Sequence, residues 1–275
     1  MLEYNYKMDR EDIAYLINTT PKYFYLLKLH ITLLKRYSKY MKWPLYIATE
    51  EPNDYFIQEI QKLFPDVNII SLTQEQEGFL DSRAAACAAL PEEIQYVFPI
   101  QEDFLLEARP LWMVFDQACK LLDRFPEVHS LRMMPSPGPR GKKVFMNTEW
   151  KVLQFGLDDY LFTYQATLWR RGSYQEYMNR LCAYLNSMSL TQKEKNKMAI
   201  DNNIAEFKFG QEVLVGMDEG ALHLAWPRDG GQPNAVYLAP WPYRPTAVVR
   251  GKLMDWAVDL ASREQVELSS GPSLR

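Results

Sequence analysis

Short apolar runs alternate with segments of helical periodicity along the first hundred residues. Apolar, β-prone runs predict four strands, at residues 12–18, 43–49, 67–72 and 96–100. Apolar residues spaced by three or four positions, or a run of alanines, predict three helices between them, at residues 23–40, 55–64 and 78–90. Regular alternation of strand and helix is typical of a parallel sheet with right-handed crossovers. The pattern therefore predicts an α/β fold.

The rest of the chain has a less regular pattern. Further strands are predicted at residues 128–134, 150–155 and 161–169. Further helices are predicted at residues 110–125, 173–185, 190–198 and 252–264. Thr191 followed by Glu194 is a capping-box pattern at the start of one of them. A loop rich in proline and glycine at residues 135–143 is interpreted as an insertion near a binding face.

Composition narrows the class of protein. The chain has 275 residues, enough for one large domain, and a net charge of −4, which argues against a nucleic-acid partner. Its three cysteines are far apart, as expected for reduced thiols rather than for a disulfide framework or a zinc site. No apolar run reaches the roughly 18 residues of a membrane span, and the N-terminus has no signal core. A cytoplasmic location is expected.

Two adjacent carboxylates follow the strand predicted at residues 96–100. Glu102 and Asp103 would lie where that strand ends, and open α/β sheets bind ligands beyond the carboxyl ends of their strands. Carboxylate oxygens suit hard divalent cations such as Mg²⁺ or Mn²⁺, which in turn bind phosphates. The alternative interpretation is a strand that ends in a solvated acidic turn.

Three sequence blocks resemble one family. Gln101–Glu107 resembles the metal-binding segment of glycosyltransferases with the GT-A fold. Tyr164–Arg171 resembles a Ser-Leu-Gln-X-X-(Ile/Leu)-Trp segment of small bacterial and viral glycosyltransferases, and Ala247–Lys252 resembles a Val-Val-X-Gly-Lys segment near their C-termini. Ile204–Glu212 stands where that group has an acidic segment. The blocks together cover roughly residues 13–265, but the acidic motif is Gln-Glu-Asp instead of Asp-X-Asp.

The resemblance implies a single GT-A-like domain over residues 1–275. Its central sheet would be mostly parallel and flanked by helices, with a mixed α/β acceptor-side region toward the C-terminus. Residues 1–107 would form the nucleotide-sugar-binding half, and residues 108–275 the acceptor half and tail. The chain would transfer a sugar from a nucleotide-sugar donor, such as a UDP- or GDP-sugar, to a carbohydrate acceptor with Mn²⁺ or Mg²⁺ as cofactor.

The same resemblance assigns roles to donor-side residues. Asp103 would bind the metal, with Glu102 beside it on metal or sugar. Thr19 and Thr20, after the first strand, would contact the nucleotide; the alternative is an ordinary turn. Arg83 would contact diphosphate or sugar, because a guanidinium matches phosphate oxygens, unless it is a surface residue of its helix.

The resemblance also implies roles on the acceptor side. An inverting transferase needs a carboxylate base near the acceptor hydroxyl. The candidates for this base are Glu206, Glu212, Asp158 and Asp159. Gln165 would bond a sugar hydroxyl, whereas Trp169 is expected in the core more than at a stacking site.

Two alternative functions stay open. A nucleotidyltransferase also carries acidic residues at strand ends, although it usually has a glycine-rich phosphate loop that Asn18–Pro21 does not resemble. A catalytically inactive relative that only binds sugar is the second alternative, because the acidic motif departs from the family pattern. Dehydrogenase, kinase, zinc-protease and α/β-hydrolase motifs are absent from the sequence, and the three histidines show no ligand spacing.

Overall fold

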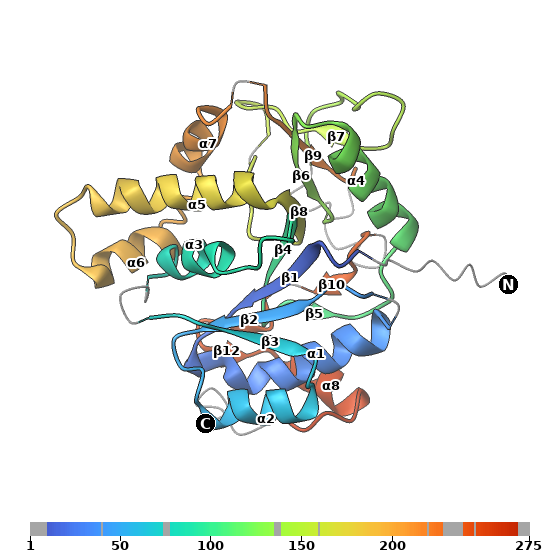
Figure 1. Ribbon diagram of the computed structural model, residues 1–275, viewed down its shortest axis with the longest axis vertical. Coiled ribbons are helices and arrows are strands. Elements are labelled where there is room, and N and C mark those ends of the chain that lie inside the picture. The colour runs from blue at the N-terminus through green and yellow to red at the C-terminus, as the bar shows by residue number, and fades with distance from the viewer. Residues whose placement is uncertain are drawn as a thin grey trace, which may run out of the picture.

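The computed structural model describes residues 10–39, 41–73, 78–134, 139–158, 160–218, 220–227, 239–244 and 246–268. One eight-stranded sheet in the order β3-β2-β1-β4-β8-β6-β9-β7 runs through this part of the chain (Figure 1). Its strands are β1 (Ile13–Asn18), β2 (Leu45–Thr49), β3 (Val67–Ser71), β4 (Tyr96–Gln101), β6 (Val128–Arg132), β7 (Lys151–Val152), β8 (Thr167–Arg170) and β9 (Leu222–Ala225). The helices are η1 (Pro21–Tyr23), α1 (Phe24–Tyr37), α2 (Tyr55–Leu63), α3 (Asp81–Ala88), α4 (Trp112–Arg124), α5 (Arg171–Asn186), α6 (Gln192–Ile200), α7 (Lys208–Val215) and α8 (Asp255–Arg263).

The sheet confirms the predicted α/β class. β1 pairs in parallel with β2 and β4, and β2 with β3, as the strand–helix alternation requires. β8 is antiparallel to both of its neighbours, β4 and β6, and β7 is antiparallel to β9. The sheet is therefore parallel in its first half and mixed in its second.

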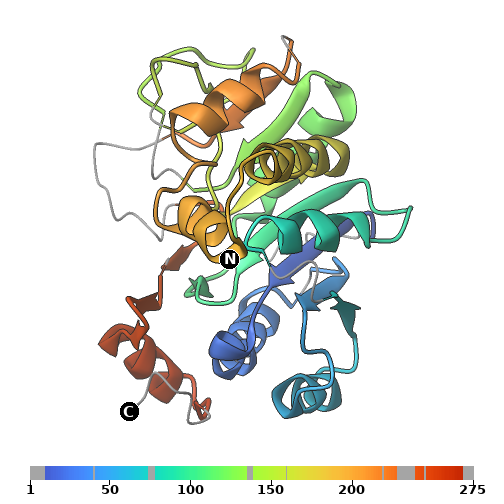
Figure 2. The ribbon, with the colours of Figure 1, turned by 90° about the vertical axis from the view of Figure 1, so that its left-hand side faces the viewer.

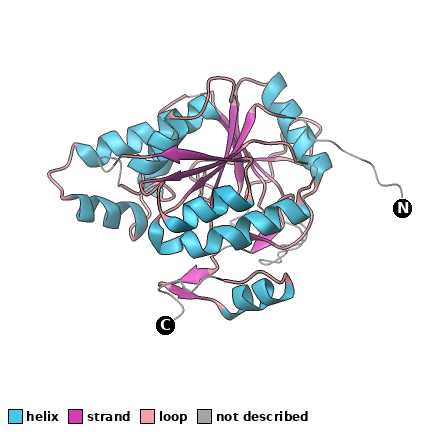
Figure 3. Cartoon of the chain, turned by 60° about the horizontal axis from the view of Figure 1, so that its bottom comes forward, coloured by secondary structure: helices cyan, strands magenta, loops and turns pink. Residues whose placement is uncertain are grey.

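Helices cover both faces of the sheet, because its strands are apolar on both sides (Figure 3). Side chains alternate along β1: Ile13, Tyr15 and Ile17 pack in the cluster that contains the apolar faces of α1, α2 and α4. Ala14 and Leu16 point to the other face and pack in the cluster built by α3, α5 and α7. The small side chains of α3 allow this helix to pack closely against α5 and the sheet.

Two predicted strands are shorter than expected. The run predicted at residues 161–169 becomes a strand only from Thr167, and the run at 150–155 only at Lys151–Val152. The buried Arg132 side chain donates to the carbonyls of Tyr160 and Leu161, at 2.7 and 3.3 Å. These side-chain bonds satisfy backbone groups that a strand would have paired, so residues 161–166 form bends.

Several local predictions are confirmed. The capping box of Thr191 and Glu194 begins α6. All three cysteines are free thiols, with Cys87 and Cys119 buried. Within the described residues, none of the helices combines the length and apolar character needed to cross a bilayer.

The C-terminal segment returns to the first half of the chain. β10 (Tyr243–Arg244) pairs with β5 (Leu105–Leu106), just after the acidic turn. A hairpin of β11 (Val248–Val249) and β12 (Lys252–Leu253) follows, and α8 then packs on α1 through the cluster that contains Leu29, Leu33 and Leu260. Figure 2 shows this red segment beside the blue α1.

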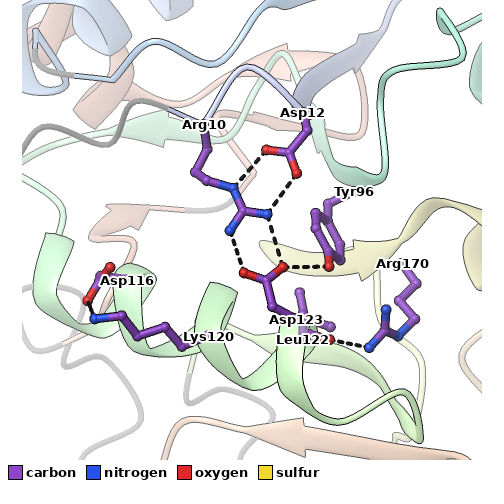
Figure 4. A network of polar contacts seen from close by, with 8 residues as sticks. All are labelled: Arg10, Asp12, Tyr96, Asp116, Lys120, Leu122, Asp123 and Arg170. Carbon is purple, nitrogen blue, oxygen red and sulfur yellow. Dashed lines mark hydrogen bonds and ion pairs between the residues drawn. The ribbon is translucent and has the colours of Figure 1, made fainter.

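A polar network closes the N-terminal ends of β1 and β4 (Figure 4). Arg10 donates to Asp12 at 2.7 Å and to Asp123 of α4 at 2.8 Å. The hydroxyl of Tyr96 donates to the same Asp123 carboxylate at 2.8 Å. Burial raises the pKa of Asp123, but the hydrogen bonds from Arg10 and Tyr96, together with the charges of Arg10 and Arg170, outweigh it and lower that pKa. Every donor and acceptor named here has a partner within the network. The network is therefore interpreted as structural, and it joins β1 and β4 to α4.

Candidate functional site

A cavity of about 560 Å³ lies at the carboxyl ends of β1 and β4. Asn18, Thr19 and Thr20 line it where β1 ends, and Gln101–Phe104 line it where β4 ends. Its walls also include residues from α3, α6, the bend before β8 and the β11 strand. The two halves of the chain therefore meet at one site, at the edge where α/β sheets bind ligands.

The predicted acidic pair lines the cavity. Glu102 is 6% exposed, and burial, together with the neighbouring Asp103 charge, raises its pKa to about 8. Burial also raises the pKa of Asp103 to about 6, against a smaller opposing effect of backbone donors. Glu102 is thus desolvated, which contradicts the alternative of a solvated acidic turn for this residue, whereas Asp103 is half-buried.

His30 of α1 supports the acidic turn from behind. Its Nδ1 lies 3.0 Å from the backbone carbonyl oxygen of Glu102, and its Nε2 lies 2.8 Å from the hydroxyl of Tyr15. A carbonyl only accepts, so Nδ1 carries the proton and Nε2 accepts from Tyr15. Burial lowers the pKa of His30 to about 4, which keeps the ring neutral. His30 therefore has a structural role: it holds the acidic turn in place.

The segment that enters the C-terminal hairpin contacts Asp103 through backbone amides. The amide of Ala247 donates to the Asp103 carbonyl at 3.0 Å, and the amide of Val248 donates to its Oδ2 at 3.4 Å. Thr246, which lines the cavity, has a φ of 65°. That conformation is unfavourable for a β-branched residue, and such strain is found mainly at functional sites.

Arg83 lines the same cavity from α3. Its guanidinium lies 3.7 Å from the ring centre of Phe79 and 5.3 Å from that of Tyr164, and it donates to the Phe79 carbonyl at 2.8 Å. The side chain is 8% exposed, so the alternative of a surface arginine is wrong. Its positive charge lowers the pKa of Glu102 against the effect of burial.

Glu206 is the proposed base that the structure brings into the cavity. Its Oε1 accepts from the Thr163 hydroxyl at 2.6 Å and from the Tyr164 amide at 2.7 Å, and its Oε2 accepts from Asn203. Gln165 lines the cavity beside it and accepts a hydrogen bond from the Tyr243 hydroxyl. The bend before β8 is therefore held by side chains that face the site.

Other predicted residues lie elsewhere. Glu212 is on α7, outside the cavity lining, in an exposed pair with Lys208. Asp158 is buried and accepts from the amides of Arg140 and Gln154, so it is a structural anchor for two loops. Asp159 lies outside the described residues. Trp169 is 1% exposed in the core, as expected.

Sequence analysis missed several residues that line the cavity: Asn18, Lys22, Glu50, Gly78, Phe79, Ser82, Tyr164, Asn196, Ile200 and Thr246. Lys22 follows the predicted Thr-Pro turn directly, so its position after β1 was an available signal. Asn196 and Ile200 had no such signal, because only the packing of α6 against the residues before α3 brings them here; one of these contacts joins the Phe79 amide to Asn196 at 3.0 Å.

The charges of the lining fit a divalent cation. Among the described residues that line the cavity, four are carboxylates (Glu50, Glu102, Asp103 and Glu206) and two are cations (Lys22 and Arg83). A diphosphate would meet an excess of two negative charges with all four carboxylates ionised, and of one while the raised pKa of Glu102 keeps that carboxyl protonated. Mg²⁺ is commonly held by one or two carboxylates and completed by water and substrate phosphates, which suits Glu102 and Asp103. Within the described parts of the chain, no three acidic, histidine or cysteine side chains could enclose a metal ion on their own.

Comparison with known proteins gives no family. No family model matches the sequence. No curated protein matches it either.

Several solved structures resemble the fold distantly. Staphylococcus aureus TarS (residues 1–349, in complex with UDP) aligns at 14% identity and a TM-score of 0.40, over 63% of this chain and 55% of that one. Pyrobaculum calidifontis mannosyltransferase PcManGT (in complex with GDP-Man and Mn²⁺) aligns at 12% identity and a TM-score of 0.40, over 64% of this chain and 48% of that one. The 4-diphosphocytidyl-2C-methyl-D-erythritol synthase of Anaerococcus prevotii aligns at 11% identity and a TM-score of 0.40, over 74% of this chain and 95% of that one. The matched region thus spans only about half of the TarS chain.

Proposed function

We propose that the chain is a nucleotide-sugar-dependent glycosyltransferase that moves a sugar to a carbohydrate acceptor. The observation that carries the proposal is the convergence of three separate predictions on one cavity. The acidic pair after β4, the threonines after β1, and Gln165 with Glu206 from the second half all line it. A structural acidic turn gives no reason for the distant Gln165 and Glu206 to lie at the same place.

On the donor side, Thr19 and Thr20 would contact the nucleotide. Asp103 would hold a divalent cation, with Glu102 beside it on the metal or the sugar. Mn²⁺ or Mg²⁺ bound there would supply positive charge for the diphosphate leaving group. Lys22 and Arg83 would bind phosphate or sugar oxygens, because both cations line the cavity.

On the acceptor side, Glu206 is the residue that we assign as base. It is the one candidate among the described residues that lines the cavity. Its three hydrogen bonds fix the carboxylate in place, and a carboxylate has about four acceptor positions, so one stays available for an acceptor hydroxyl. Gln165 would orient the sugar through the amide that Tyr243 holds.

A donor panel tests the proposal. The protein is incubated with UDP- and GDP-sugars, Mn²⁺ and a set of oligosaccharide acceptors, and the products are separated by chromatography. Release of nucleoside diphosphate with an extended oligosaccharide is the expected result. Release of pyrophosphate from a nucleoside triphosphate and a sugar phosphate would instead indicate nucleotidyl transfer. Donor binding without turnover would indicate a sugar-binding relative, and the absence of donor binding would overturn the proposal.

A further inference from the structure

Exposed apolar side chains occur in the lining of the cavity and directly after the lining residue Glu206 in the sequence. Ile200, the last residue of α6, lines the cavity and is still 54% exposed. Phe207 follows Glu206 directly and is 48% exposed. Its ring lies 5.9 Å from that of Tyr160, centre to centre.

The local backbone fixes the position of Phe207. The amides of Glu206 and Phe207 both donate to the Asn203 carbonyl, at 3.0 and 3.2 Å, in a turn where Asn203 has a φ of 47°. Gly210 allows α7 to approach that turn, since a Cβ there would lie 2.1 Å from the Ala205 carbonyl oxygen. The turn therefore presents Glu206 to the cavity and places Phe207 next to it.

Tyr160 is held from the other side. The buried Arg132 guanidinium donates to its carbonyl at 2.7 Å. Because both rings belong to backbone segments with fixed partners, a ligand that stacks on them would not have to order a loose loop.

We infer that Phe207 and Tyr160 form the platform on which the acceptor sugar stacks. This rests on the proposed function and adds the chemical class of the acceptor: an oligosaccharide with an apolar pyranose face. An acceptor whose hydroxyl reaches Glu206 must extend over the adjoining surface. Beyond Glu206 the chain offers the aromatic carbon of Phe207 and of Tyr160, which packs on it, and Ile200 adds aliphatic carbon to the lining. Such carbon suits the C–H face of a pyranose better than a charged ligand.

The test measures binding of maltohexaose, cellohexaose, chitohexaose and mannohexaose by saturation-transfer NMR, with UDP and Mn²⁺ present. We expect at least one hexasaccharide to bind, with its ring protons closest to the protein. Phe207→Ala should weaken that binding about tenfold, the order expected for the loss of one stacked apolar surface, and Phe207→Trp should retain it.

A matched control is available on α2. Tyr55 is also exposed, at 72%, and also packs on a neighbouring ring, that of Phe56. α2 lies at the opposite end of the molecule from α7 (Figure 1), so Tyr55→Ala should bind the hexasaccharide like the parent. Thermal melting verifies that each variant is folded.

Two results would overturn the inference: no hexasaccharide binds, or Phe207→Ala binds as tightly as the parent. UDP binding is measured separately in the same samples. A protein that binds UDP and no hexasaccharide would keep the proposed donor site and lose the platform. A protein that binds a hexasaccharide through Phe207 but no nucleotide would contradict glycosyl transfer instead.

Discussion

The Nδ1 proton of His30 bonds the backbone carbonyl of Glu102 at 3.0 Å, so a helix buried behind the sheet fixes the main chain of the acidic turn. The other ring nitrogen accepts from Tyr15 of β1 at 2.8 Å. The turn is thus attached to β1 and α1 through a neutral imidazole, and its carboxylates are left to face the cavity.

Replacing His30 by leucine should destabilise the protein by about 2–4 kcal/mol, because the Glu102 carbonyl and the Tyr15 hydroxyl would both lose a buried partner. The pKa of His30 is lowered to about 4 in the folded state. A lowered pKa means that the neutral ring contributes its full stability above about pH 6.5, and that this contribution is lost as the pH falls through 4. Urea unfolding at pH 7 and at pH 4 should therefore show a smaller difference between the parent and His30→Leu at pH 4. An equal difference at both pH values would contradict this account of His30.

Glu102 should make the metal-free protein less stable as the pH rises. Its folded-state pKa is raised to about 8, so the folded chain keeps a proton that the unfolded chain loses near pH 4.5. The associated stability is present below pH 4.5 and lost as the pH rises through 8. Glu102→Gln removes the titration. At pH 8.5 we expect the free energy of unfolding of this variant to exceed that of the parent by at least about 1 kcal/mol, since one pKa unit corresponds to about 1.4 kcal/mol.

Unfolding by urea with EDTA present measures this difference at pH 5 and pH 8.5. If the parent is as stable as Glu102→Gln at the higher pH, the carboxylate is not desolvated as described.

Asp103→Ala should abolish Mn²⁺-dependent binding of UDP or GDP. The variant should stay folded, because it keeps the bond from the Ala247 amide to the backbone carbonyl of residue 103 and loses only the 3.4 Å bond from the Val248 amide to the side chain. Calorimetric titration with nucleotide and Mn²⁺ measures the effect. The matched control is Asp66→Ala, an exposed acid paired with Lys35, which should bind nucleotide like the parent. Unchanged binding by Asp103→Ala would exclude this residue as the metal ligand.

Replacing Glu206 and replacing Glu212 should have very different effects on stability and on the rate of sugar transfer. Glu206→Ala removes the acceptor of three hydrogen bonds beside the cavity. We expect it to lose about 1–3 kcal/mol of stability and at least about a hundredfold in transfer rate, the usual contribution of a general base. Glu212→Ala removes an exposed pair with Lys208 and should change stability by less than about 0.5 kcal/mol. Equal rates for the two variants would remove Glu206 as the base.

The hairpin that reaches Asp103 depends on a glycine. Arg250 and Gly251 connect β11 and β12 with φ values of 51° and 76°, as a two-residue hairpin turn requires. Gly251→Ala should destabilise the protein by about 1–2 kcal/mol, because an L side chain is strained there. Gly172→Ala is the control. Its Cβ would meet nothing within 4 Å, so this helical substitution should be neutral or stabilising by up to about 1 kcal/mol. Thermal melting measures both, and equal effects would show that the turn conformation is unimportant.

The periodicity of the chain predicted the parallel half of the sheet well. Continuous apolar runs such as Tyr96–Ile100 and amphipathic helices such as 55–64 give strong local signals, and both formed where expected. The second half was harder to predict, because side chains replace the strand ladder there. Arg132 binds the carbonyls of Tyr160 and Leu161, and no local pattern in residues 161–166 reveals a partner 28 positions away.

Part of the candidate site could likewise be predicted. Glu102 and Asp103 follow a strand directly, so their place in the sequence defines their place at the sheet edge. The choice between Glu206 and Glu212 could not be made, because it depends on the turn at Asn203 and on the packing of α7. His30 had no sequence signal at all, since its bond to Glu102 joins positions 72 apart.

The bond between Asp103 and Val248 has a consequence for biosynthesis. Its partners lie 145 positions apart, so the acidic turn leaves the ribosome long before the segment that holds it. Domains fold as their residues emerge during translation, and the sheet from β1 to β4 can begin to form early. The carboxylate that we assign to the metal acquires its final backbone contacts only when residues 246–254 have been synthesised. In a nascent chain the acidic turn would therefore lack these contacts until residues 246–254 have emerged from the ribosome.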